Sequence, residues 1–129
     1  MPEDSPKRAD IDRFIQDRVE SVPHLEALLL LWRERPKNWS ADTLTERLWV
    51  GPEAARAILR DLARENLIIA VADLEEYRYE SDPEKDRLLS ALSEFYRQDL
   101  VGISTMIHLK SSPAVREFAR AFRLKKEQE

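Results

Sequence analysis

The chain of 129 residues contains no cysteine, and this absence removes three kinds of chemistry. It excludes a disulfide framework, a thiolate metal site and a cysteine nucleophile. A protein without cysteine fits a reducing compartment, so we expect a cytoplasmic location.

Glycine and long apolar runs are also scarce. Gly51 and Gly102 are the only glycines, whereas 43% of the residues are hydrophobic and 36% are charged. This composition favours helices around a single core. The longest aliphatic run, Leu28 to Leu31, is far shorter than the roughly 20 residues that cross a bilayer, and the polar N-terminus does not read as a signal peptide. We therefore expect one globular domain without a membrane partner.

Apolar residues recur at helical spacing through the first half of the chain. Residues 1–9 predict a disordered lead-in, and residues 10–21 predict a short helix that docks on the core. Ser21 and Pro23 are typical of the start of a second helix, and Ser40 is typical of the N-cap of a third. The expected buried residues are Ile11, Phe14, Ile15 and Val19, then Leu25, Leu28, Leu29 and Trp32, then Ala41, Leu44, Leu48 and Trp49.

A tight turn at Val50, Gly51 and Pro52 is expected to precede a fourth helix, with Gly51 supplying the unusual backbone angles. The inward residues of this helix follow the spacing i, i+3, i+4, i+7. They are Ala55, Ile58, Leu59 and Leu62. The opposite, outward stripe consists of Glu53, Arg56, Ala57, Arg60 and Arg64.

The second half predicts a hairpin followed by helices. Residues 67–72 and 77–79 are typical of two short strands, with a turn at residues 73–75. Asp82 and Pro83 begin a long helix that Gly102 is expected to bend, and Ser112 and Pro113 begin a last helix. The apolar stripe of the long helix is Leu89, Leu92, Tyr96, Leu100, Ile103 and Ile107. That of the last helix is Val115, Phe118, Ala119 and Phe122.

Charge is distributed unevenly although the net value is only −4. Residues 73–86 carry seven acids and two bases, whereas residues 110–126 carry six bases and one acid. The asymmetry predicts one surface that repels nucleic acid and another that attracts it. For the basic segment, we favour an ordinary amphipathic helix over a DNA contact. A second basic patch, formed by Arg33, Arg35 and Lys37 beside Trp39, fits a backbone contact and a solvated helix end equally well.

The order helix, helix, tight turn, helix, hairpin, long helix resembles the winged helix-turn-helix domains of bacterial transcriptional regulators. The resemblance rests on residues 44–62, LTERLWVGPEAARAILRDL, with Asn66, Leu67 and Ile68 leading into the wing, and it covers residues 22–81. The flanking helices resemble the dimerisation elements of MarR-like and PadR-like regulators. The expected fold is therefore mainly α, a winged helix-turn-helix with a short β-hairpin wing and additional N- and C-terminal helices. Residues 82–129 are the expected dimerisation region.

In such domains the helix after the turn enters the major groove, and the wing contacts the backbone or the minor groove. The resemblance implies that the DNA-facing positions are Pro52, Glu53, Arg56, Ala57, Arg60 and Arg64 on the helix, and Arg78 in the wing. Arg56 and Arg60 are suited to bidentate contacts with guanine, whereas Glu53 must accept from cytosine or repel phosphate. The alternative is a solvated helix face with local pairs, Glu53 with Arg56 and Asp61 with Arg64, each worth about 0.2 to 0.5 kcal/mol.

No arrangement of residues suggests catalysis or a cofactor. His24 and His108 lack other ligands at metal-binding spacing, and the acids of residues 73–86 lack the spacing of a calcium loop. We expect core packing for Trp32 and Trp49. The predicted function is a non-enzymatic, DNA-binding transcriptional regulator that acts as a homodimer on double-stranded DNA. The alternative is a winged-helix module that binds another protein through its acidic wing.

Overall fold

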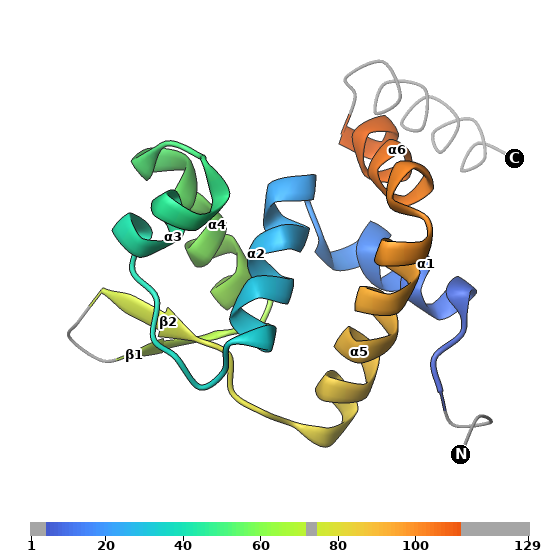
Figure 1. Ribbon diagram of the computed structural model, residues 1–129, viewed down its shortest axis with the longest axis horizontal. Coiled ribbons are helices and arrows are strands. Elements are labelled where there is room, and N and C mark those ends of the chain that lie inside the picture. The colour runs from blue at the N-terminus through green and yellow to red at the C-terminus, as the bar shows by residue number, and fades with distance from the viewer. Residues whose placement is uncertain (1–4, 72–74, 112–129) are drawn as a thin grey trace, which may run out of the picture.

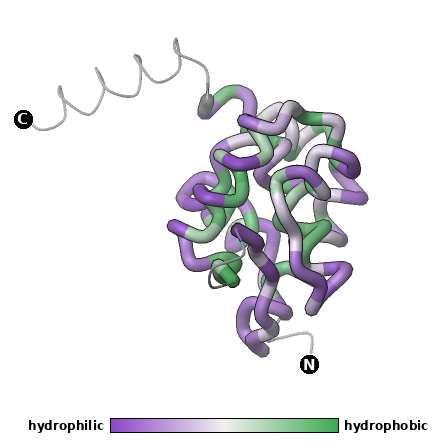
Figure 2. The backbone as a smooth tube through the Cα atoms, turned by 90° about the vertical axis from the view of Figure 1, so that its left-hand side faces the viewer, coloured by the Kyte–Doolittle hydropathy of each residue, from purple (hydrophilic) through white to green (hydrophobic). Residues whose placement is uncertain are grey.

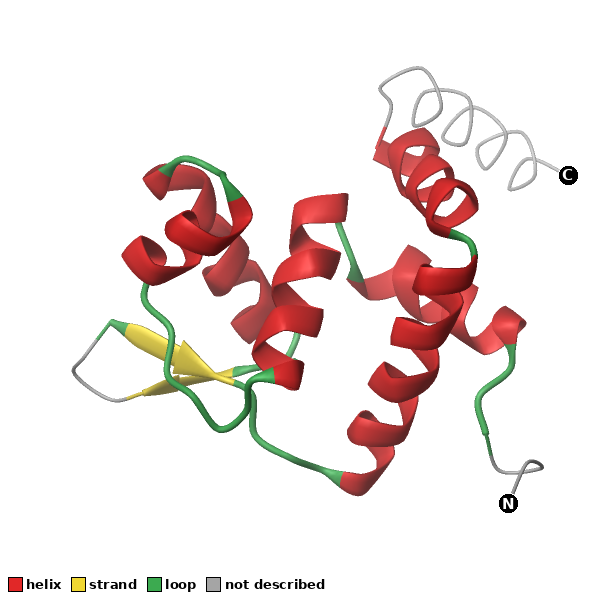
Figure 3. Cartoon of the chain, viewed as in Figure 1, coloured by secondary structure: helices red, strands yellow, loops and turns green. Residues whose placement is uncertain are grey.

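The structure, a computed structural model, describes residues 5–71 and 75–111 (Figure 1). Within these ranges the protein is mainly α, with one small antiparallel sheet of two strands (Figure 3). The helices are α1 (Arg8–Arg18), α2 (Val22–Arg33), α3 (Ala41–Leu48), α4 (Pro52–Arg64), α5 (Pro83–Gln98) and α6 (Leu100–Ser111). None of these helices is both long enough and apolar enough to span a membrane.

Helix α2 lies at the centre of the molecule. It packs against α3 and α4 on one side and against α5 and α6 on the other, and α1 packs on α5 and α6 (Figure 1). Five consecutive residues of α2, from Ala27 to Leu31, are buried, as expected for a helix that is covered on more than one face. Hydrophobic and hydrophilic residues alternate along the backbone (Figure 2), and each of the other helices buries apolar residues in the core.

Helix α1 docks on the core through the residues that the sequence predicts. Ile11, Phe14, Ile15 and Val19 are all buried. The helix begins at Arg8, so the expected disordered lead-in is wrong for residues 8 and 9, and residues 1–4 lie outside the described ranges. It ends at Arg18 rather than at residue 21, because Ser21 is the N-cap of α2 and accepts a hydrogen bond from the His24 main-chain N–H.

Three basic side chains join α1 to distant parts of the chain. Arg8 forms an ion pair with Asp99 at 3.1 Å, at the start of α6. Lys110 Nζ donates to the main-chain oxygens of Ile15 and Gln16 at 2.6 and 2.8 Å, and so caps the C-terminal end of α1. Arg18 donates to the main-chain oxygen of Glu65, just after α4. Helix α1 is therefore tied to both halves of the molecule.

The connection from α3 to α4 differs from the expectation at two residues. Trp49 has φ 58° and ψ 33° and caps α3 in the left-handed conformation, with its N–H donating to the Thr45 oxygen. Gly51 is extended, with φ −69° and ψ 161°, so the prediction that it supplies the unusual angles is wrong. Because the left-handed cap ends the helical spacing, Trp49 leaves the stripe of Leu44 and is 92% exposed, which overturns its expected core position.

The hairpin consists of β1 (Ile69–Val71) and β2 (Glu76–Arg78), with Ile69 opposite Arg78. Trp39, before α3, extends this sheet by one bridge to Tyr77. Its N–H donates to the Tyr77 oxygen at 2.6 Å, and the Tyr77 N–H donates back at 2.7 Å. Trp39 is fully buried, so it anchors the hairpin on the core beside α3 and α4. The predicted turn residues 73 and 74 lie outside the described ranges.

Asp99 interrupts the predicted long helix between α5 and α6. Its backbone leaves the helical region, with φ −140° and ψ 60°, while its carboxylate accepts a hydrogen bond from the Gly102 N–H at 3.1 Å. The break therefore falls three residues before the predicted bend at Gly102. It rotates Leu100 off the apolar stripe, and this residue is 54% exposed, whereas Leu92 and Ile103 remain buried. The predicted last helix, residues 113–122, lies outside the described ranges.

Candidate nucleic-acid interface

Helix α4 presents a basic outer face because its apolar residues are packed inward. Ala55, Ile58, Leu59 and Leu62 are at most 4% exposed, as the sequence predicts. The predicted DNA-facing residues Pro52, Glu53, Arg56, Arg60 and Arg64 are exposed, and Ala57 is half-buried. Pro52 is the first helical residue, so the exposed face begins directly after the turn from α3.

Arg56 and Arg60 lie beside a groove between α4, the start of α3 and the hairpin. The groove has a volume of about 370 Å³. Its remaining lining residues are Ser40, Ala41, Asp42, Leu59, Glu75 and Tyr77. Both arginines therefore share one concave surface, which also contains the carboxylates of Asp42 and Glu75.

The structure separates Arg64 from these two arginines. Arg64 forms an ion pair with Asp61, as predicted for a solvated helix face, and lines a different cavity. The other predicted local pair, Glu53 with Arg56, is not formed, and neither Arg56 nor Arg60 has an ion-pair partner in the part of the chain that the structure describes. Among the described residues, two guanidinium groups on the α4 face therefore lack an ion-pair partner, and the third is paired with Asp61.

Arg78 is not brought to this groove. Successive side chains of a strand point to opposite faces, and its neighbour Tyr77 lines the groove. Arg78 is half-buried and lies 3.8 Å from the Glu80 carboxylate. The hairpin and the segment after it carry four exposed acids, Glu75, Glu80, Asp82 and Glu84. The wing is therefore predominantly negative where the structure describes it.

In the second basic patch, at the end of α2, Arg35 and Lys37 make contacts within the protein. The guanidinium of Arg35 stacks over Trp32 at 5.0 Å, and the ammonium of Lys37 stacks over Trp39 at 4.4 Å. Lys37 also lies 3.8 Å from a carboxylate oxygen of Glu34. These contacts agree with the interpretation of this patch as a solvated helix end.

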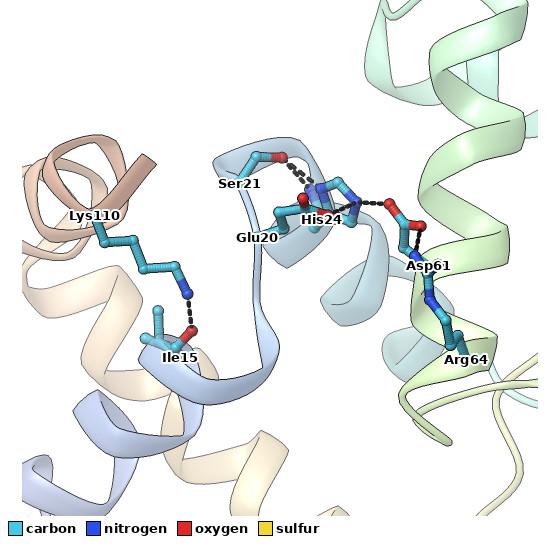
Figure 4. A network of polar contacts seen from close by, with 7 residues as sticks. All are labelled: Ile15, Glu20, Ser21, His24, Asp61, Arg64 and Lys110. Carbon is cyan, nitrogen blue, oxygen red and sulfur yellow. Dashed lines mark hydrogen bonds and ion pairs between the residues drawn. The ribbon is translucent and has the colours of Figure 1, made fainter. Parts of the chain in front are cut away.

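A polar network on the inner side of α4 joins it to the start of α2 (Figure 4). His24 lies between Ser21 and Asp61: its Nδ1 is 2.6 Å from Ser21 Oγ, and its Nε2 is 2.9 Å from Asp61 Oδ2. Glu20 Oε2 is 3.7 Å from the same Nε2. Burial of Asp61 raises its pKa, but the hydrogen bond and charge of His24, with the charge of Arg64, outweigh burial and lower it overall.

Glu20, His24 and Asp61 are the described residues whose geometry suits a metal ion, because their ligand atoms all lie within 4.8 Å of one another. Three bases, Arg18, Arg64 and Lys110, line the same cavity of about 370 Å³, and they oppose the binding of a cation. The contacts of His24 with Asp61 and Ser21 account for the cluster as a structural network. The sequence did not indicate this cluster, because Asp61 is 37 residues from His24.

Trp49 lies at the surface, although the sequence predicts it in the core. Its side chain is the most exposed large hydrophobic group that the structure describes, and it lies three residues before Pro52. It also lines a shallow pocket with Pro23, Glu26, Arg47 and Leu48. The signal that could have revealed it is the sequence Val50-Gly51-Pro52, which ends α3 before a further helical residue can join its apolar stripe.

Comparison with protein-family models, with curated proteins and with solved structures finds no match to this chain. The helical composition and the antiparallel hairpin are compatible with a winged helix.

Proposed function

We propose that this chain is a winged helix-turn-helix protein that binds double-stranded DNA as a homodimer and regulates transcription. In this proposal α2, α3 and α4 are the three core helices, with α4 as the recognition helix and β1 and β2 as the wing. The bridge between Trp39 and Tyr77 supports the assignment, because it holds the hairpin against the segment that leads into α3. Recognition helices of this type read bases with residues near their N-terminal end.

The observation that carries the proposal is the contrast between the arginines of α4. Arg56 and Arg60 are exposed, one turn apart, and without a carboxylate partner among the described residues, whereas Arg64 is paired with Asp61. An unpaired guanidinium does not have to break an ion pair before it binds phosphate or guanine. We therefore assign the main DNA contacts to Arg56 and Arg60, with Pro52, Glu53 and Ala57 also facing the major groove of the DNA.

Fluorescence anisotropy with labelled genomic fragments at low ionic strength tests this assignment. The variant Arg56→Ala with Arg60→Ala is expected to weaken binding by about 30-fold or more, at roughly 1 to 3 kcal/mol for each base-contacting arginine. The matched control is Arg13→Ala with Arg87→Ala. It removes the same charge from exposed arginines on α1 and α5 and is expected to bind nearly as wild type. Equal losses in both double variants would contradict a recognition role for α4.

A second candidate function is a winged-helix module that binds a basic protein rather than DNA. The exposed acids Glu75, Glu80, Asp82 and Glu84 favour this alternative, because they form a negative surface along the wing and the start of α5. Neutralising Glu75, Glu80 and Glu84 to glutamine distinguishes the two functions. DNA binding should then strengthen, because repulsion of phosphate is removed, whereas capture of a basic partner should be lost.

A further inference from the structure

The groove beside α4 contains charges of both signs that do not pair with one another. Arg56 and Arg60 line it from α4, Asp42 lines it from the first turn of α3, and Glu75 lines it from just before β2. No guanidinium nitrogen of either arginine lies within 4.0 Å of either carboxylate. A purely anionic ligand is attracted by the arginines and repelled by the carboxylates. The lining therefore favours a ligand that carries one charge of each sign.

The groove also has an apolar part and the size of a small-molecule site. Leu59 is buried and Tyr77 is half-buried, and both line the groove together with Ala41. The volume of about 370 Å³ is near the lower end of the roughly 300 to 1,000 Å³ that is usual for ligand pockets. An apolar or aromatic group of a ligand can pack against this part. The groove therefore suits a small zwitterion with an apolar side chain.

Glu75 has a backbone conformation that is unusual for its residue type. Its φ is 52°, in the left-handed region that favours glycine and asparagine. Its carboxylate forms no hydrogen bond or ion pair with any residue in the part of the chain that the structure describes, so no such contact offsets the strain. Strained residues occur often at ligand sites. The conformation of Glu75 is therefore a second observation, independent of charge, that points to a ligand in this groove.

We propose that the groove binds a free α-amino acid with an apolar side chain. The carboxylate of the ligand accepts hydrogen bonds from Arg56 and Arg60, and its ammonium donates to Asp42 and Glu75. Each charged group of the ligand thus meets the opposite charge and is compensated for the water that it loses. The side chain of the ligand packs against the apolar part of the groove.

The bound amino acid competes with DNA for Arg56 and Arg60. This consequence, unlike the binding itself, rests on the proposed function, because that function assigns the same two arginines to DNA. The affinity of the protein for DNA therefore falls as the concentration of the amino acid rises. The groove would then be an effector site that overlaps the DNA-binding face.

An NMR titration of the full chain without DNA tests the site with three probes of similar shape. L-phenylalanine carries both charges, 3-phenylpropanoate carries only the carboxylate, and 2-phenylethylamine carries only the ammonium. L-phenylalanine is expected to bind about tenfold or more tightly than either analogue, because each analogue loses one set of charge-assisted hydrogen bonds. An unchanged spectrum with L-phenylalanine, or an equal affinity for 3-phenylpropanoate, would overturn the proposal.

Variants of the two carboxylates test the ammonium contact. Asp42→Asn is expected to weaken binding of L-phenylalanine by about tenfold and to strengthen binding of 3-phenylpropanoate, because the repulsion of the carboxylate is reduced. Glu75→Gly is expected to weaken binding of L-phenylalanine similarly. Glycine favours the left-handed conformation at residue 75, so this variant stays folded. Wild-type affinity for L-phenylalanine in both variants would contradict the proposed role of the carboxylates.

Arg13→Gln and Asp17→Asn are the matched controls for charge. Both residues are exposed on α1, outside the groove, and each change is expected to leave the affinity for L-phenylalanine unchanged. An equal loss of affinity in these controls would show that net charge, rather than the groove, governs binding.

Fluorescence anisotropy with labelled DNA separates this inference from the proposed function. Excess L-phenylalanine is expected to weaken DNA binding, and 2-phenylethylamine is expected to have little effect. A chain that binds DNA but not L-phenylalanine would overturn this inference alone. A chain that binds L-phenylalanine but not DNA would contradict the proposed function alone. Simultaneous binding of both ligands without loss of affinity would overturn the competition for Arg56 and Arg60.

Discussion

The carboxylate of Asp99 occupies the space that a side chain at residue 102 would need. A Cβ atom on Gly102 would lie 2.2 Å from Asp99 Oδ2, far inside van der Waals contact. Asp99 accepts from the Gly102 N–H and also pairs with Arg8, so one carboxylate caps α6 and holds α1. Gly102 therefore makes room for the carboxylate of Asp99 in its present position, and its backbone conformation is an ordinary one.

This relationship predicts coupled effects on stability. Asp99→Ala should lower the free energy of unfolding by about 1 kcal/mol, because α6 loses its N-terminal cap. Gly102→Ala in that background should recover roughly 0.5 to 1 kcal/mol, because alanine is the better helix former once the carboxylate is gone. In the wild type the same change displaces Asp99 and should bring no gain. Urea denaturation of the four proteins measures the coupling, and additive effects would contradict the account.

The contact between Asp61 and His24 predicts a dependence of stability on acid. The pKa of Asp61 in the folded protein is lower than its ordinary value of 3.8. The ionised carboxylate therefore stabilises the fold fully above pH 3.8, and this stabilisation is lost as the pH falls through the folded pKa. Asp61→Asn should therefore destabilise the protein by about 1 to 2 kcal/mol at pH 7, and the difference should shrink towards pH 3. Asp17→Asn removes an exposed carboxylate from α1 and serves as the control. A difference that is the same at pH 7 and pH 3 would show that the Asp61 charge is not involved.

The environment of Tyr79 predicts that the stability of the protein falls at alkaline pH. It is fully buried and its hydroxyl donates to Asp86 Oδ1 at 2.5 Å, and burial together with this carboxylate raises the pKa of Tyr79 well above 10. The stabilisation from Tyr79 is therefore complete below pH 10. It is lost as the pH rises further, because the tyrosine hydroxyl deprotonates in the unfolded chain before it does so in the folded protein. Denaturation between pH 8 and pH 11 should show this loss in the wild type and a smaller loss in Tyr79→Phe. Identical slopes would exclude Tyr79 as the cause.

Fluorescence quenching of the tryptophans tests the structure of the turn between α3 and α4. Trp49 is 92% exposed and Trp39 is fully buried, so acrylamide should quench mainly Trp49. Trp49→Phe should remove most of the quenchable fluorescence and change stability by no more than about 0.5 kcal/mol. Trp39→Phe should leave the quenching unchanged and should destabilise the protein by about 1 kcal/mol or more. A large loss of stability in Trp49→Phe would place that side chain in the core.

The inward stripe of α4 could be predicted from the sequence because it depends on local spacing alone. Ala55, Ile58, Leu59 and Leu62 repeat at the helical period, and the caps at Ser21, Ser40 and Asp82 are recognisable from residue type. All are found as expected. These signals determine where helices begin and which face is apolar.

Helix ends and long-range polar contacts could not be predicted in this way. The exposure of Trp49 follows from one left-handed residue, and the break before α6 follows from Asp99, whose partners Arg8 and Gly102 lie on different helices. The difference between Arg56 and Arg64 depends on Asp61, which accepts from both Arg64 and His24. The pair of Asp61 with Arg64 is local and was one of the two pairs that the sequence suggested, whereas the contact of Asp61 with His24 requires the tertiary arrangement.

The most direct test of the central claim is the salt dependence of DNA affinity. For the wild type, the logarithm of the association constant should fall steeply with the logarithm of salt concentration, by about 0.9 for each phosphate contact. Removal of Arg56 and Arg60 should lower the affinity at every salt concentration, with any phosphate contact they make reducing the slope, whereas removal of Arg13 and Arg87 should change neither. A wild-type protein that shows no salt-dependent binding at low ionic strength would contradict the claim that the α4 face binds DNA.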